Sequence, residues 1–133
     1  MADRISNAAA WLRQAEDDLR YAKLSLGAGY FAQCCFVAQQ VAEKAVKSIW
    51  LRKGLVYPLT HSITQMCKSL KINGRFLDAA AVLDLYYVSG RYPFGDATIA
   101  PFETFQKHQA EQAVAFAIRF VKKAKQLQKT KRR

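Results

Sequence analysis

The chain has 133 residues, close to the usual length of one domain, and is long enough for a single hydrophobic core. Hydrophobic residues make up 51% of it, with only 3 Pro and 6 Gly, which excludes disordered, collagen-like and linker-like chains. Lys and Arg number 21 against 10 Asp and Glu, so the formal net charge is +11 and favours polyanionic partners.

Apolar residues that recur at steps of three and four predict five helices, and no segment predicts a strand. The second helix has an apolar face so wide that we expect it to lie at the centre and to touch neighbours on more than one side. Gly and Pro residues mark the helix ends. The predicted helices cover residues 5–26, 30–53, 61–71 and 75–88, and a last long helix begins near Pro101.

Small residues dominate the apolar stripe of the last helix, which includes Ala110, Ala113, Val114, Ala117, Val121 and Ala124. They let two helix backbones approach closely, so we expect this helix to pack tightly against another long one. Because the loops are short, neighbouring helices should be antiparallel. The predicted fold class is all-α, an up-down bundle of four to five helices, with one domain at residues 1–126 and a basic tail at 127–133.

The sequence predicts a cytoplasmic protein without a membrane segment. Its first residues, MADRISNAAAWLRQAEDDL, contain Asp3 and Arg4 and lack the apolar core and cleavage site of a signal peptide. The longest apolar stretch, Ala28 to Leu51, is interrupted by glutamines and charged residues that a membrane span could hardly carry.

The three cysteines, Cys34, Cys35 and Cys67, form no even disulfide framework and show no metal-ligand spacing. We interpret them as buried reduced thiols. The chain also has no glycine-rich phosphate loop and no nucleophile with an evident base. The sequence therefore predicts no metal site and no cofactor.

From Arg119 to the end, the chain carries many Lys and Arg residues and no acid. Such a segment contacts polyanions through counterion release, which weakens steeply with salt. The alternative is a solvated helix end, where cations are favoured by the helix dipole. The candidates for nucleic-acid contact are Lys122, Lys123, Lys125, Lys129, Arg132 and Arg133.

A polar stripe runs along the predicted central helix. Gln39, Glu43 and Lys47 stand at successive four-residue steps, and Gln40 and Lys44 run beside them. Glu43 placed before Lys47 is the favourable order for a helical ion pair, which contributes about 0.2 to 0.5 kcal/mol. Because a wide apolar surface surrounds the stripe, we expect these polar groups to lie near an interface or a cleft.

The segment LDLYYVSGRYPFGD places an arginine among aromatic residues at the end of the fourth helix. Pro93 fixes the direction of the chain, and Gly90 supplies backbone freedom just before Arg91. The guanidinium of Arg91 is forked for bidentate contact, so it suits a phosphate. A base or ribose could rest on the nearby rings of Tyr86, Tyr87 and Tyr92.

Each of these residues also has a structural interpretation. Arg91 could instead pair with Asp96 or Glu43 and pin the loop to the bundle, because the same fork binds a carboxylate. His61 stands at a predicted helix start, where it could contact an anion or simply pack or cap the helix.

Taken in order, five segments of the chain resemble the HEPN family: AEDDLRYAKL, YFAQCCFVAQQVAEKAVKSIWLRKG, LTHSITQM, LDLYYVSGRYPFGD and AEQAVAFAIRFVKKA. The resemblance covers roughly Trp11 to Ala124. Its most specific parts are Gln39-Gln40 with Glu43-Lys44 and Lys47, the pair Thr60-His61, and Arg91-Tyr92-Pro93 followed by Asp96. The last part is similar to the subgroup with an Arg-Tyr-Pro motif, although Phe94 and Gly95 here separate the proline from the aspartate.

The resemblance implies a helical bundle that dimerises and associates with nucleotides or nucleic acid. It also implies a small nucleotidyltransferase as a separate partner protein. The ribonucleases of the family depend on an Arg followed four to six residues later by a His. Here the His after Arg91 is His108 and the His after Arg52 is His61, so this motif is absent.

The leading hypothesis is a non-enzymatic homodimeric module that binds ATP, GTP or RNA and works with a nucleotidyltransferase, as in a toxin–antitoxin pair. One alternative is a divergent ribonuclease in which the fold or the dimer brings Arg91 together with His61 or His108. Another is a nucleic-acid-binding protein that acts through its basic tail. The candidates for nucleotide or anion contact are Arg91, Tyr92, Asp96, His61, Lys47, Lys44, Glu43 and Gln40.

Overall fold

The computed structural model describes residues 4–92 and 98–130, and this part of the chain is helical without a strand. The helices are α1 (Arg4–Gly27), α2 (Phe31–Arg52), α3 (Ile63–Leu70), α4 (Arg75–Ser89), α5 (Pro101–Thr104) and α6 (Lys107–Thr130). The predicted all-α bundle is confirmed. None of the described helices is both long and apolar enough to cross a membrane.

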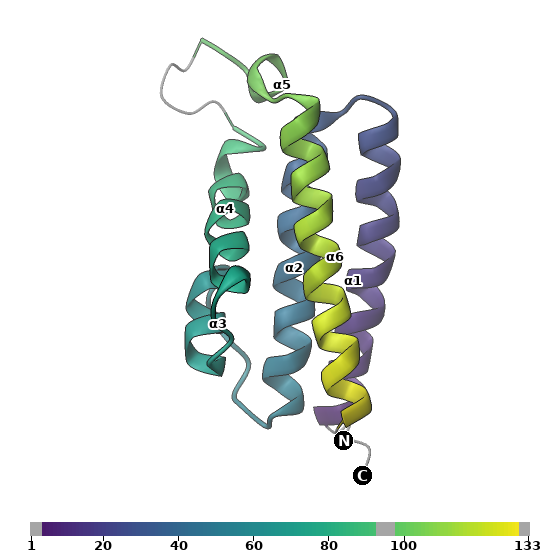
Figure 1. Ribbon diagram of the computed structural model, residues 1–133, viewed down its shortest axis with the longest axis vertical. Helices are drawn as coiled ribbons and strands as arrows, with labels where there is room; N and C mark the ends of the chain where they lie inside the picture. The colour runs from purple at the N-terminus through teal and green to yellow at the C-terminus, as the bar shows by residue number, and fades with distance from the viewer. Residues whose placement is uncertain (1–3, 93–97, 131–133) are drawn as a thin grey trace.

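Three long helices, α1, α2 and α6, lie side by side, and α3 and α4 pack along one flank of this group (Figure 1). Helix α2 contacts α1, α6, α4, α3 and α5, so its predicted central position is confirmed. The end of α4 lies near α5 and the start of α6, whereas its beginning lies beside the later turns of α6 (Figure 1). Helix α4 therefore reaches from one end of the bundle toward the other.

The core between α2 and α6 is built mainly from alanines and small aliphatic residues. Ala38, Ala42 and Ala45 of α2 are fully buried, as are Ala113 and Ala117 of α6. Small side chains at helical spacing leave room for close backbone approach. The wide apolar face of α2 is thus shared among several neighbours rather than directed at one.

The last helix differs from its prediction at its start. The structure ends α5 at Thr104 and begins α6 only at Lys107, so the predicted helix from Pro101 is interrupted. Phe105 has an extended backbone, and its ring packs edge-on against Tyr86 with 5.5 Å between ring centres. At the other end, α6 continues through residues 127–130, which the sequence predicts as tail.

All three cysteines are free and buried, as predicted. Burial raises the pKa of Cys34 to about 11 and that of Cys67 to about 12. The pKa of Cys35 is raised to about 12, first by burial and then by its neighbour Cys34. These thiols remain protonated at neutral pH, which leaves them poor nucleophiles and poor metal ligands.

Gly90 is needed for its small size and not for backbone freedom, because its φ of −78° and ψ of −11° are ordinary helical angles. A Cβ atom at this position would lie 2.9 Å from the carbonyl oxygen of Tyr86. It would also lie 3.2 Å from the carbonyl oxygen of Ala32 and 3.2 Å from Cβ of Phe36. The glycine therefore lets the end of α4 approach α2 closely.

We expect Gly90→Ala to destabilise the protein by about 1 to 3 kcal/mol, because the added methyl group forces helix backbones apart. Thermal unfolding followed by circular dichroism measures this loss. Gly27→Ala is the matched control, since nothing lies within 4 Å of a Cβ there and alanine favours a helix. Equal melting temperatures for the two variants would contradict the close packing of α4 on α2.

Candidate functional site

A buried ion pair lies in the middle of α2. The ammonium Nζ of Lys47 lies 2.7 Å from Oε2 of Glu43, and the two side chains are only 5% and 4% exposed. The predicted helical pair is therefore present, but inside the bundle. Because both charges are removed from water, each needs the other to remain ionised at acceptable cost.

Further donors converge on the same carboxylate. Nδ1 of His61 lies 3.2 Å from Oε2 of Glu43, and the side-chain amides of Gln39 and Gln40 each donate to Oε1 over 3.4 Å. Gln40 also donates to the side-chain oxygen of Gln39 at 2.7 Å, and Gln39 donates to the carbonyl oxygen of His61 at 3.1 Å. The polar stripe of α2 is thus one connected network that reaches the segment before α3.

Aromatic rings enclose the other end of the network. The ammonium of Lys47 lies 5.3 Å from the ring centres of both Trp11 and Tyr57, within the range of a cation–π interaction. These rings come from α1 and from the loop after α2. Neighbouring elements therefore cover the stripe at Lys47 and Glu43, and both side chains are buried. Lys44 has a different partner, since it forms an ion pair with Asp18 of α1.

His61 carries the network to the surface. Its side chain is 60% exposed, and its ring stacks on Tyr87 of α4 with 4.7 Å between centres and 19° between planes. A carboxylate can only accept, so Nδ1 donates to Glu43, and in the neutral imidazole the lone pair then lies on Nε2.

The start of α3 does not offer the anion site that the sequence suggested for His61. Helix α3 begins at Ile63, after the N-cap residue Ser62. The carboxylate of Asp84 accepts hydrogen bonds from the backbone amides of Ile63 and Thr64, at 2.9 and 3.0 Å. An acidic side chain of α4 therefore already occupies the helix start.

Arg91 follows the end of α4 and also contacts Tyr87. Its Nε donates to the carbonyl oxygen of Tyr87 at 3.0 Å, and its guanidinium carbon lies 4.9 Å from the Tyr87 ring centre. The guanidinium also lies 4.4 Å from the ring centre of Phe36 and 5.0 Å from that of Tyr92. Aromatic rings therefore hold the side chain in position. Arg91 is nevertheless exposed, so part of its side chain faces solvent.

The ring of Tyr87 thus contacts both Arg91 and His61. Beside Arg91 lies an open cleft of about 460 Å³ between the end of α4, α1, α2 and α5. Its lining includes Tyr21, Phe36 and Phe102, which offer aromatic surface next to the guanidinium. A cleft of this size with a few polar groups has the dimensions of a small-ligand site.

The sequence offered two roles for Arg91, namely contact with a ligand or an ion pair with Glu43 or Asp96. Among the described residues, Arg91 pairs with no carboxylate, and Glu43 binds Lys47 and His61 instead. Asp96, the other predicted partner and a candidate contact residue, lies outside the described residues.

Sequence reasoning missed the contact of Arg91 with Phe36, which lies on another helix. It also grouped Tyr86 with the other tyrosines, whereas Tyr86 is buried against Phe105. His108, the second candidate histidine, is exposed near the start of α6.

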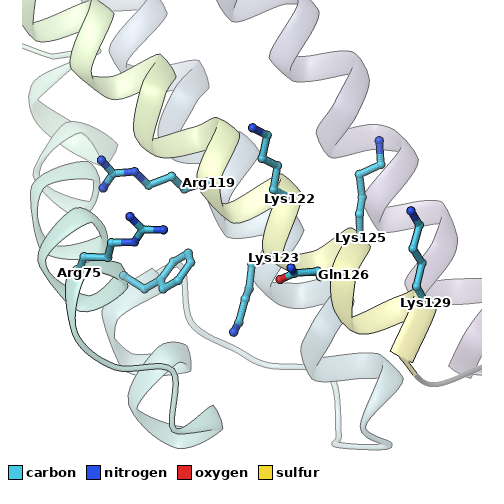
Figure 2. Close-up of a pocket in the computed structure, with 8 residues that line it drawn as sticks. Arg75, Arg119, Lys122, Lys123, Lys125, Gln126 and Lys129 are labelled. Atoms are coloured by element: carbon cyan, nitrogen blue, oxygen red, sulfur yellow. The ribbon is translucent and has the colours of Figure 1, made fainter.

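The basic candidates near the carboxyl end form a second surface. An open groove of about 510 Å³ lies between the start of α4 and the later turns of α6 (Figure 2). Arg75 was not predicted to belong to it, and Arg119 was assigned to the basic segment but not to the contact candidates. Arg132 and Arg133 lie outside the described residues. The groove is lined by Arg75, Phe76, Arg119, Lys122, Lys123, Lys125, Gln126 and Lys129. Across residues 4–92 and 98–130, no group of His, Cys, Asp or Glu side chains is arranged to hold a metal ion.

Comparisons with known proteins identify the family of the chain. The model of the HEPN domain matches residues 8–127. The crystal structure of TT1696 from Thermus thermophilus is 34% identical, covers 90% of this chain and 96% of its own, and has a TM-score of 0.83. ST0689, an archaeal HEPN homologue, is 32% identical over 96% of this chain and 99% of its own, with a TM-score of 0.79. A Methanocaldococcus jannaschii protein named "Putative toxin MJ1304" is 25% identical over 83% of this chain and 80% of its own.

We expect Lys47→Met to destabilise the fold by about 3 to 5 kcal/mol, because it leaves the buried carboxylate of Glu43 without its cation. The double variant Lys47→Met/Glu43→Gln removes both charges and should recover much of that loss. Urea unfolding measures both free energies. A double variant no more stable than Lys47→Met alone would contradict the coupling of the two charges.

Proposed function

The chain belongs to the HEPN domain family, and we propose that it is the HEPN component of a toxin–antitoxin pair that binds a nucleotide, free or within RNA, beside Tyr87. The observation that carries the proposal is the shared contact of Arg91 and His61 with the ring of Tyr87. The name of the Methanocaldococcus jannaschii relative, a candidate toxin, supports the toxin–antitoxin setting.

The chemistry of the site suits a nucleotide. A guanidinium presents a planar fork that matches phosphate geometry, and aromatic stacking holds the Arg91 fork in place. Aromatic faces in the adjacent cleft, such as Phe36 and Phe102, would stack on a base. The exposed imidazole of His61, which stacks on the same Tyr87 ring, would add a hydrogen-bonding group.

The proposed partner is a small nucleotidyltransferase that would act as the antitoxin. The sequence resemblance supports this assignment, and joint expression followed by co-purification tests it.

We also propose a homodimer, supported by exposed apolar residues such as Tyr21, Leu24 and Phe102 on one side of the bundle. Light scattering measures the molar mass of the purified protein in solution. A mass equal to that of one chain would exclude the homodimer.

A second candidate function is RNA cleavage, which the contact between His61 and Glu43 favours. With Nδ1 donating to the carboxylate, Nε2 can take the proton of a ribose 2′-hydroxyl. The 2′-oxygen would then bond to phosphorus, the bond from phosphorus to the 5′-oxygen would break, and that oxygen would take a proton from water. Arg91 would stabilise the charge on the phosphate oxygens.

We expect Arg91→Ala to weaken binding of ATP, GTP or a short RNA about tenfold to a hundredfold, because one charge-assisted phosphate contact contributes about 1.5 to 3 kcal/mol. Calorimetric titration measures the affinity. Arg20→Ala removes the same charge from an exposed pair with Asp17 on α1 and serves as the control. Equal affinities for the two variants would exclude Arg91 from the site.

If the second function holds, His61→Ala should abolish cleavage of a labelled RNA while His108→Ala, which removes the other histidine, leaves it intact. A substrate with 2′-deoxy sugars should resist the enzyme, since it lacks the attacking hydroxyl. Gel electrophoresis of the products separates these cases. Cleavage by His61→Ala at the native rate would rule out this mechanism.

A further inference from the structure

The basic groove between α4 and α6 is separate from the Tyr87 site. Arg75 is the first residue of α4, whereas Arg91 follows its last turn, so the two arginines stand about 22 Å apart along a helix of this length. The side chains of Arg75 and Arg119 extend into the space between the two helices, while Lys122, Lys125 and Lys129 follow one another along α6 (Figure 2). The tertiary fold has therefore joined cations from two distant parts of the sequence.

Most of this charge has no counter-ion within the described part of the protein. Lys125 pairs with Glu16 of α1 at 2.8 Å. Among the described residues, no carboxylate pairs with Arg119 or Lys122, nor with Arg75, Lys123 or Lys129. Arg75 and Lys123 instead lie 5.8 and 5.5 Å from the ring centre of Phe76, which lines the groove. A concentration of like charges of this kind is held in place by packing and attracts a polyanion.

The dimensions of the groove fit one strand of nucleic acid. Residues 119 to 129 of α6 rise about 15 Å along the helix axis. The wall of α6 is therefore long enough to contact several successive phosphates of one strand. An acidic protein segment would present carboxylates without the regular spacing of a phosphate backbone. Phe76 also lines the groove and offers an aromatic contact to a base, which an acidic segment lacks.

We infer that the groove lined by Arg75, Arg119 and the lysines of α6 is a binding track for the phosphate backbone of a single nucleic-acid strand. The track is independent of the Tyr87 site in chemistry, since it needs only charge and spacing. It gives the protein affinity for a strand of any sequence. This affinity falls as the salt concentration rises, because counterion release then becomes less favourable.

The test is fluorescence anisotropy of the full chain with labelled oligouridine, repeated over a range of salt concentrations. We expect Arg75→Gln/Arg119→Gln to make the slope of log affinity against log salt shallower by about 1.4, because each single-strand phosphate contact contributes about 0.7. Lys23→Gln/Lys68→Gln removes two exposed charges outside the groove and should leave the slope unchanged. The basic residues 131–133 are present in every variant, so their contribution cancels.

Equal slopes for the groove variant and its control would overturn the inference, as would binding of polyglutamate with no binding of oligouridine. Oligodeoxythymidine, run in parallel, tells whether the strand is RNA alone or also DNA. Equal slopes in this test would not bear on the Tyr87 site. Likewise, a calorimetric result that excludes Arg91 from the Tyr87 site would not bear on the groove.

Discussion

The buried ion pair of Lys47 and Glu43 is the constraint on which the candidate site depends. Breaking such a pair by removing one partner leaves an uncompensated charge in the core, which is strongly destabilising. Glu43 therefore stays where Lys47 and two glutamines hold it. Because the same carboxylate binds His61, charges inside the bundle determine where an exposed imidazole lies.

Helix α4 connects this network to both of the anion-binding surfaces that we propose. Tyr87 lies between His61 and Arg91, and the small size of Gly90 lets the helix end approach α2 so that Arg91 reaches Phe36. A guanidinium already held against rings loses little side-chain freedom when a phosphate binds. At its other end the same helix presents Arg75 to the basic groove. Helix α4 and the residues directly after it thus supply a cation to each site.

The helices could be predicted because burial of an apolar stripe leaves a periodic record in the sequence itself. The break before α6 could not, since it depends on Phe105 packing against Tyr86 of another helix. The polar stripe of α2 was expected at a cleft because spacing along one helix does not reveal which elements cover it, here Trp11 and Tyr57. For the same reason Arg91 was found from its local motif, while its contacts with other helices were not.

The most direct test of the account is a nuclear magnetic resonance titration of protein with labelled tyrosine and histidine rings, using a short RNA or ATP. Tyr87 and His61 are in contact, whereas Tyr86 is buried in the core and serves as an internal control. The account predicts that the ring signals of Tyr87 and His61 shift together with one affinity while those of Tyr86 stay in place. Saturated binding that leaves Tyr87 and His61 unchanged would contradict it.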